Sequence, residues 1–201
     1  MLEAALKSAK RRPGRQNARI YHELGLVQFS LGRPREAMEY FEQALQIIES
    51  DEYQRRDREY ITSINMDIAR TLYELGEYHA AGEVYRKLLR AWGENEPTYW
   101  ICRWSLAGCE TASNRFEDAR KNLEAIVNSE SPVTIRDSAG ADLLSLRYRI
   151  AFRDYEDRDY QSSITQLESL LKESIGDDSL RSDILASSQD VSRKLEPAMK
   201  S

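Results

Sequence analysis

The chain has 201 residues, of which 41% are hydrophobic, enough for one ordinary domain or two small ones to bury a core. Its 34 acidic and 29 basic residues give a net charge of −5 and form no polybasic face, which disfavours nucleic acid as the main ligand. Nine Gly and five Pro are few for this length, and Ala, Leu, Glu, Arg and Ser predominate. This composition argues against disorder throughout and favours an all-α protein.

Targeting signals and membrane spans are not indicated. The stretch from Met1 to Lys10 is amphipathic and charged, without the apolar segment of a signal peptide. No later segment approaches the roughly 20 apolar residues that a membrane span needs. We therefore expect a soluble, cytoplasmic protein with no membrane partner.

The first predicted element is one helix within residues 1–14, ended by Pro13 and Gly14. Its apolar residues recur at helical spacing: Leu2, Ala5, Leu6 and Ala9. The helix is typical of the second half of a repeat whose first half is missing, so it either caps the next repeat or belongs to a longer array. Self-association through this half-repeat is an open alternative. The basic residues near its end favour a solvated helix end over a localisation signal: Lys10, Arg11, Arg12 and Arg15.

The next part of the chain shows one pattern four times: two small residues twelve positions apart, with a turn between them. Two antiparallel helices joined by a short turn come close only where both carry small side chains. Two small residues placed symmetrically about the turn face each other, because they lie at the same distance from it along the two helices. Each window therefore predicts a helical hairpin. The small pairs are Gly25 and Ala37, Ala69 and Ala81, Ala107 and Ala119, and Ala151 and Ser163.

The turns of the four hairpins serve as register marks. They are centred on Gly32, Gly76, Asn114 and Arg158. Gly32 and Gly76 can adopt the left-handed conformation that ends a helix, and Pro34 suits the first position of the helix that follows.

We expect the chain to form a single domain, residues 1–201. It consists of the half-repeat helix 1–14, hairpins over 18–52, 60–92, 97–129 and 137–174, and a capping helix over 178–196. The capping helix has a polar outer side, as the end of a repeat array requires. Its apolar residues are Leu180, Ile184, Leu185, Val191 and Leu195.

Two cysteines, Cys102 and Cys109, lie seven residues apart on one predicted helix, which places them about 10 Å apart along its axis. A disulfide needs Cα atoms closer than about 7 Å, so the two cannot pair within that helix. Their spacing matches no zinc motif, and we expect buried free thiols.

The repeated windows resemble the tetratricopeptide repeat, in which Leu-Gly or Leu-Ala of a first helix is followed by a turn Gly and then by Ala, an aromatic residue and Ala in a second helix. The turns recur more widely than the basic 34-residue unit, and the third window resembles the expanded repeats of kinesin light chains and of sensor modules attached to large signalling NTPases. The resemblance implies a right-handed superhelix, or α-solenoid, of about four hairpins with flanking N- and C-terminal helices. The position usually held by Trp departs from the family pattern and carries Tyr21, Asn65, Arg103 and Arg147.

In the resembled family, residues of each first helix line a concave groove that holds a peptide. Aromatic side chains and Arg are the types enriched at binding hot spots. The alternative for several rings, Phe29 and Phe152 above all, is that they pack in the core. Carried over by register, the groove residues are Arg19, His22, Leu26, Phe29, Met66, Arg70, Tyr73, Trp104, Tyr148, Phe152 and Tyr155.

Catalytic and metal-binding motifs are not indicated. His22 and His79 lie in different repeats, and we expect the first on a helix surface and the second beside a turn. The chain carries no Gly-rich phosphate loop, zinc motif or nucleophile elbow, so neither an enzyme nor a cofactor is predicted. One acidic run lacks the central Gly and terminal Glu of a calcium loop and is interpreted as a solvated turn. It comprises Asp154, Glu156, Asp157 and Asp159.

The sequence thus favours a non-catalytic scaffold or adaptor that binds a peptide or protein segment in an aromatic-lined groove. The alternative is a sensor or oligomerisation domain of a larger signalling protein, whose groove is occupied by its own chain or by a second copy. An enzyme built on a helical-repeat scaffold is the third and least supported interpretation.

Overall fold

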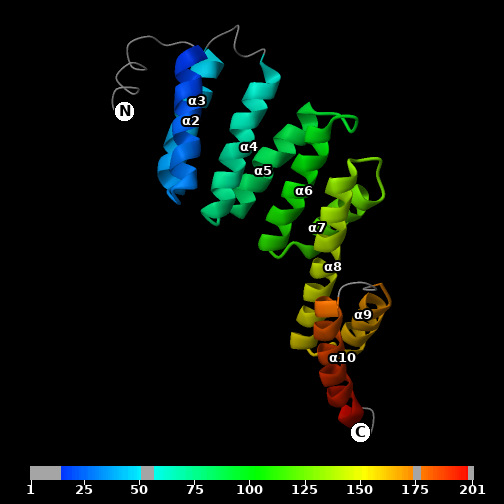
Figure 1. Cartoon of the computed structure of the whole chain (residues 1–201). Helices are drawn as coiled ribbons and strands as arrows, with labels where there is room; N and C mark the ends of the chain where they lie inside the picture. The colour runs from blue at the N-terminus through cyan, green and yellow to red at the C-terminus, as the bar shows by residue number, and fades with distance from the viewer. Residues whose placement is uncertain (1–14, 51–56, 174–177, 199–201) are drawn as a thin grey trace. The chain divides into compact units, whose positions relative to one another are not determined.

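The computed structural model describes residues 15–50, 57–173 and 178–198. The helix expected over residues 1–14, with most of its basic cluster, lies outside this described part. Every regular element in the described part is an α-helix, and no strand occurs there (Figure 1). The predicted all-α repeat fold is confirmed.

The helices follow one another with short connections, as expected for consecutive hairpins. Their bounds are α2 (Arg15–Ser30), α3 (Pro34–Ser50), α4 (Arg58–Glu74), α5 (Tyr78–Ala91), α6 (Pro97–Ala112), α7 (Phe116–Val127), α8 (Val133–Glu156), α9 (Tyr160–Glu173) and α10 (Asp178–Ala198). The fourth hairpin begins with the longest of them, α8, which starts before the expected residue 137.

The chain divides into two compact units, one ending at Asn114 and the other starting at Arg115. In the first unit, α2 packs on α3, α3 on α4, α4 on α5 and α5 on α6. In the second unit, α7 packs on α8, α8 on α9 and α9 on α10. The boundary falls in the turn of the third predicted hairpin, so its two helices belong to different units.

A residue in the left-handed conformation stands at each of the four predicted turns. After α2, the N–H of Gly32 donates to the carbonyl of Phe29 and the N–H of Arg33 to that of Gln28, each at 3.0 Å. The reversal therefore satisfies the last carbonyls of the helix, which would otherwise lack partners. The φ angles are 72° at Gly32, 80° at Gly76, 58° at Asn114 and 66° at Arg158.

The paired small residues are buried, as the hairpin argument requires. A Cβ atom added to Gly25 would lie 2.4 Å from Cε1 of Phe41, a side chain that is itself fully buried. Helices α2 and α3 therefore approach too closely at this point for any side chain larger than hydrogen. The other buried members are Ala37, Ala69, Ala81, Ala107, Ala119, Ala151 and Ser163.

Each unit has its own apolar core. In the first, Phe41, Ile48 and Ile64 are fully buried between α2, α3 and α4. Cys102 and Cys109 are buried free thiols, as predicted, and burial raises the pKa of Cys102 to about 11.

In the second unit, the core of the last three helices joins α9 to α10. Leu167 and Leu170 of α9 pack with Ile184 and Val191 of α10, and all four are buried. Of the apolar residues predicted for the capping helix, Ile184 and Val191 thus dock it on the last hairpin, whereas Leu185 is exposed and the side chains of Leu180 and Leu195 are outside the described part.

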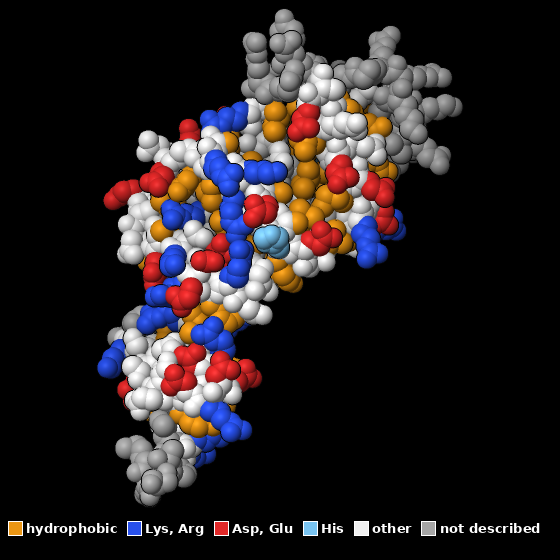
Figure 2. Space-filling view, turned by 180° about the vertical axis from the view of Figure 1, so that it is seen from behind, with side chains coloured by type: hydrophobic (Ala, Val, Ile, Leu, Met, Phe, Trp, Pro, Cys, Tyr) orange, Lys and Arg blue, Asp and Glu red, His pale blue; other side chains and the backbone are white. Residues whose placement is uncertain are grey.

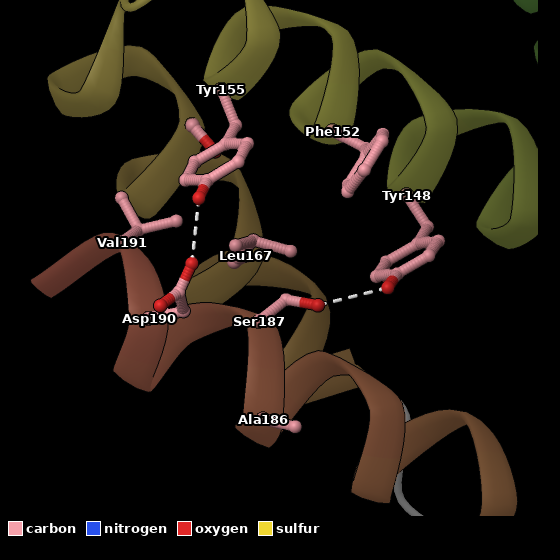
Figure 3. Close-up of a pocket in the computed structure, with 9 residues that line it drawn as sticks. Tyr148, Phe152, Tyr155, Leu167, Ala186, Ser187, Asp190 and Val191 are labelled. Carbon is pink, nitrogen blue, oxygen red and sulfur yellow. Dashed lines mark hydrogen bonds between the residues drawn. The ribbon is translucent and has the colours of Figure 1, made fainter. Parts of the chain in front are cut away.

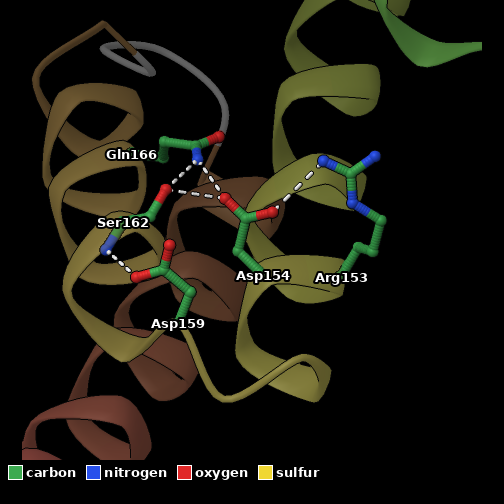
Figure 4. Close-up of polar contacts among 5 residues, drawn as sticks. All are labelled: Arg153, Asp154, Asp159, Ser162 and Gln166. Carbon is green, nitrogen blue, oxygen red and sulfur yellow. Dashed lines mark hydrogen bonds and ion pairs between the residues drawn. The ribbon is translucent and has the colours of Figure 1, made fainter.

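The acidic run at the α8–α9 turn is not wholly solvated, which corrects the sequence interpretation. The Asp154 side chain is only 15% exposed and accepts hydrogen bonds from Ser162 Oγ at 2.7 Å and Gln166 Nε2 at 2.6 Å (Figure 4). Asp159 accepts from the backbone N–H of Ser162 at 3.1 Å. These carboxylates tie the turn to the start of α9: Asp159 accepts from an N–H group of its first turn, and Asp154 accepts from two of its side chains.

Within the described residues, no group of His, Cys, Asp or Glu side chains is placed to hold a metal ion. Among the described helices, none combines the length and the apolar character needed to cross a membrane.

Substitution of the helix-interior glycines tests the close approach of α2 and α3. Gly25→Ala should destabilise the protein by about 1 kcal/mol or more, because the clash with Phe41 outweighs the gain in helix propensity. Gly108→Ala should stabilise it by about 0.5–1 kcal/mol, since nothing lies within 4 Å of the added Cβ. Urea unfolding measures both, and the same sign for the two variants would contradict the packing argument.

The left-handed turn at Arg158 gives a second prediction. Arg158→Gly should stabilise the protein by about 0.5–1 kcal/mol, because relief of the left-handed strain exceeds the added chain entropy of glycine. Asp157→Gly is the matched control, since Asp157 has an ordinary φ of −74° and gains nothing. Thermal unfolding of the two variants should give midpoints that move in opposite directions.

Candidate binding site

One face of α8 carries three of the predicted groove residues. Tyr148, Phe152 and Tyr155 are spaced four and three positions apart, so they lie above one another on the same side of the helix. Ala151, beside them on the helix surface, is buried in the core that α8 shares with α9 and α10, which fixes the orientation of the helix. The aromatic face is therefore presented to α10.

The aromatic face forms one wall of a pocket in the second unit. The pocket has a volume of about 230 Å³ and lies between α8, α9 and α10. Helix α10 provides the opposite wall, and α9 closes the pocket (Figure 3). Its lining residues are Tyr148, Phe152, Tyr155, Ser163, Leu167, Ala186, Ser187, Asp190 and Val191.

Two hydrogen bonds join the walls of the pocket. The hydroxyls of Tyr148 and Ser187 are 2.9 Å apart, and the Tyr155 hydroxyl donates to Asp190 Oδ2 at 2.6 Å (Figure 3). Phe152 lies between the two tyrosines and is 47% exposed, with its ring stacked on that of Tyr155 at a centroid distance of 5.9 Å. The tyrosine rings are thus held in place, while the Phe152 ring is open to a ligand.

Charged groups meet at the Tyr155 end of the pocket. Lys194 donates to the Tyr155 hydroxyl, and its Nζ lies 4.4 Å from the centre of that ring and 3.7 Å from Asp190 Oδ2. The hydrogen bond from Tyr155, with the positive charge of Lys194, lowers the pKa of Asp190 below its ordinary value. The same hydroxyl and the charge of Asp190 raise the pKa of Lys194. The rim therefore carries a stable carboxylate next to an apolar opening.

Sequence reasoning missed the part of this site that α10 contributes. The sequence predicts a polar outer side for the capping helix, but Ser187, Asp190 and Lys194 turn back to α8. Their spacing of three and four residues with Val191 places them on one helix face, and this was the available signal.

In the first unit, the predicted groove residues fall into exposed and half-buried groups. The Arg70 guanidinium lies 4.3 Å above the centre of the Phe29 ring, which packs partly on the core. Tyr73 is exposed and meets Tyr78 edge to face, with centroids 5.0 Å apart. Among the remaining predicted groove residues of this unit, Arg19 is exposed, and Leu26, Met66 and Trp104 are partly buried.

The prediction that His22 lies on a helix surface is wrong. The residue is 8% exposed, and its Nε2 lies 2.7 Å from Asp67 Oδ2, which links α2 to α4. The imidazole also meets the rings of Phe41 and Tyr60 edge to face at 5.6 and 5.5 Å. His22 is thus part of the packing between repeats, whereas His79 is exposed beside its turn as expected.

Acidic and basic side chains lie close together on the face of the molecule that Figure 2 shows. This mixture agrees with the near balance of charges in the sequence and contrasts with the clustered basic surface typical of nucleic-acid binding.

The charged groups at the Tyr155 end of the pocket, Asp190 and Lys194, give a prediction for Tyr155→Phe. Loss of the hydroxyl should raise the pKa of Asp190 toward its ordinary value, because its main hydrogen-bond donor is removed. Since the pKa is lowered in the folded state, Asp190 stabilises the fold above the ordinary Asp pKa, and this contribution is lost as pH falls through the lowered value. Carboxyl ¹³C NMR titration measures the shift. Tyr148→Phe is the control, and an equal shift in both variants would contradict the assignment.

Comparison with known proteins places the chain in a family. A model of the tetratricopeptide repeat matches residues 18–51, and another matches residues 66–132, so the two together span half of the chain. No curated protein sequence matches the chain.

Solved structures show the same fold at low sequence identity. The kinesin light chain nearly identical TPR-like repeats of Podosopora anserina are 18% identical, with a TM-score of 0.55 over 93% of this chain and 92% of that one. The apo quorum sensor NprR from B. thuringiensis is 18% identical, with a TM-score of 0.60 over 97% of this chain and 53% of that one. Apo RapI is 15% identical, with a TM-score of 0.53 over 85% of this chain and 46% of that one.

The chain thus spans about half the length of NprR and RapI and nearly all of the Podosopora anserina repeats. The sequence matches, the four left-handed turns and the buried small pairs all point to one repeat type. The chain belongs to the tetratricopeptide repeat family.

Proposed function

We propose that the chain is a non-catalytic interaction module that binds a peptide segment in the pocket between α8 and α10. Tetratricopeptide repeats are generally a non-catalytic interaction fold, and this supports a protein or peptide as the partner. NprR is described as a quorum sensor, which agrees with a role in recognition.

The observation that carries the proposal is the exposed Phe152 ring in the pocket wall. A mostly apolar pocket with a few placed polar groups is the usual form of a binding site. Aromatic anchors in such pockets supply most of the binding energy at interfaces. The two flanking tyrosines are already held by hydrogen bonds to α10, so little ordering is needed when a ligand enters.

The described side chains favour binding over catalysis. The raised pKa of Cys102 keeps it as a thiol, which is a poor nucleophile. Buried Glu110 is paired with Arg86 at 3.3 Å, and His22 is paired with Asp67. These groups hold neighbouring helices together and are not gathered at the pocket.

The proposal includes the first unit as a further contact surface. Its exposed groove residues, Arg19, Arg70 and Tyr73, lie on α2 and α4, the first helices of two hairpins. Arg70 is stacked on Phe29, which leaves its guanidinium oriented for a carboxylate or carbonyl of a ligand.

The alternative of a sensor domain filled by its own chain is favoured by one observation: α10 itself hydrogen-bonds to the predicted groove residues of α8. Against it, a volume of about 230 Å³ is left between these helices. An outside ligand is therefore the better supported occupant.

Peptide display tests the proposal. Peptides selected on the 201-residue chain should lose at least about tenfold in affinity for Phe152→Ala, because truncation of a central aromatic anchor costs about 2 kcal/mol. Val133→Ala is the matched control, since Val133 is another exposed apolar residue of α8 and does not line the pocket. Fluorescence anisotropy with labelled peptides measures both, and circular dichroism checks that the variants fold.

Selected peptides that bind Phe152→Ala as well as the unaltered chain would contradict the proposed site. Failure to select any peptide would favour the alternative in which the chain fills its own groove.

A further inference from the structure

The pocket is lined by a buried hydroxyl that has no hydrogen-bond partner among the described residues. Ser163 of α9 is 0% exposed, and its Oγ makes no hydrogen bond there. The other hydroxyls of the lining, those of Tyr148, Tyr155 and Ser187, all have partners. Burial of a polar group without a partner is unfavourable, so this hydroxyl calls for an explanation.

Packing between the helices does not require the hydroxyl. The same position of the other three hairpins is held by alanine, at Ala37, Ala81 and Ala119, and each is fully buried. A methyl group therefore satisfies the close approach of paired helices in this chain. Among the four hairpins, the hydroxyl occurs at this position only in the one that lines the pocket.

The size of the pocket indicates what kind of group it accepts. An apolar cavity of about 150 Å³ holds one benzene molecule, so a pocket of about 230 Å³ has room for a ring with a substituent. The walls supply the rings of Tyr148 and Phe152, and aromatic pairs add specific stacked or edge-to-face contacts. An aromatic ring is thus the best fit to the walls.

We propose that the pocket selects a tyrosine side chain of the bound peptide, and that Ser163 determines this specificity through a hydrogen bond to the phenol. The inference rests on the proposed function and names the anchor that the pocket takes. Ser163 lines the pocket, and rotation of its side chain between staggered rotamers moves Oγ without a change in the backbone. The phenol then supplies the partner that the hydroxyl lacks.

The test compares two probes of nearly equal shape. The 201-residue chain is titrated with p-cresol, the side chain of tyrosine, and with toluene, the side chain of phenylalanine, and dissociation constants are measured by NMR. The unaltered chain should bind p-cresol about tenfold more tightly, which is the effect of one hydrogen bond. Toluene is the more apolar probe, so burial alone would give the opposite order.

Two variants test which residues cause the difference in affinity between the two probes. Ser163→Ala matches the other three hairpins and should fold normally, yet it should remove the preference for p-cresol. Phe152→Ala should weaken binding of both probes. Equal or tighter binding of toluene by the unaltered chain, absence of binding by either probe, or a preference that survives in Ser163→Ala would overturn the inference.

The failure of this inference is distinguishable from failure of the proposed function. Displayed peptides that depend on Phe152 but bind Ser163→Ala unchanged would leave the peptide site in place and overturn the role of Ser163. Loss of the selected peptides in Ser163→Ala, confined to those that contain tyrosine, supports it.

Discussion

Within each unit, the fold depends on the close approach of two antiparallel helices that form a hairpin. Small residues on both helices permit this approach, and Gly25 against Phe41 is its tightest instance. A left-handed residue at each turn reverses the chain within a few residues. Since the second helix of a hairpin covers only one side of the first, the first helix keeps one face free of its partner. That face is where the exposed Arg70, Tyr73 and Phe152 lie.

In the second unit, the close approach of paired helices is combined with a terminal helix, α10, which both covers the core and lines the pocket. Helix α10 buries Ile184 and Val191 on its inner side, and places Ser187 and Asp190 opposite the tyrosines of α8. Apolar contacts therefore hold the helix in place, while its hydrogen bonds orient the aromatic wall. The result is a pocket whose apolar walls and polar rim have separate structural roles.

The hairpins could be predicted from sequence because their determinants are local: the twelve-residue spacing of small residues and the turn residues between them. Asn114 and Arg158, which are not glycine and were predicted only as turn residues, adopt the left-handed conformation as well. The environment of His22 was missed because it depends on Asp67, which lies on a different hairpin. The α10 wall was missed for the same reason, since its partners on α8 lie far away in sequence. Pairings between repeats are set by tertiary packing, which a repeat pattern alone does not specify.

The central claim is that ligands enter between α8 and α10 and contact the Phe152 ring. A crystal structure of the chain with one display-selected peptide tests this most directly. The account predicts a peptide side chain seated against Phe152, with the hydrogen bonds of Tyr148 and Tyr155 to α10 intact. A peptide bound on another surface, with the pocket between α8 and α10 unchanged and unfilled, would contradict it.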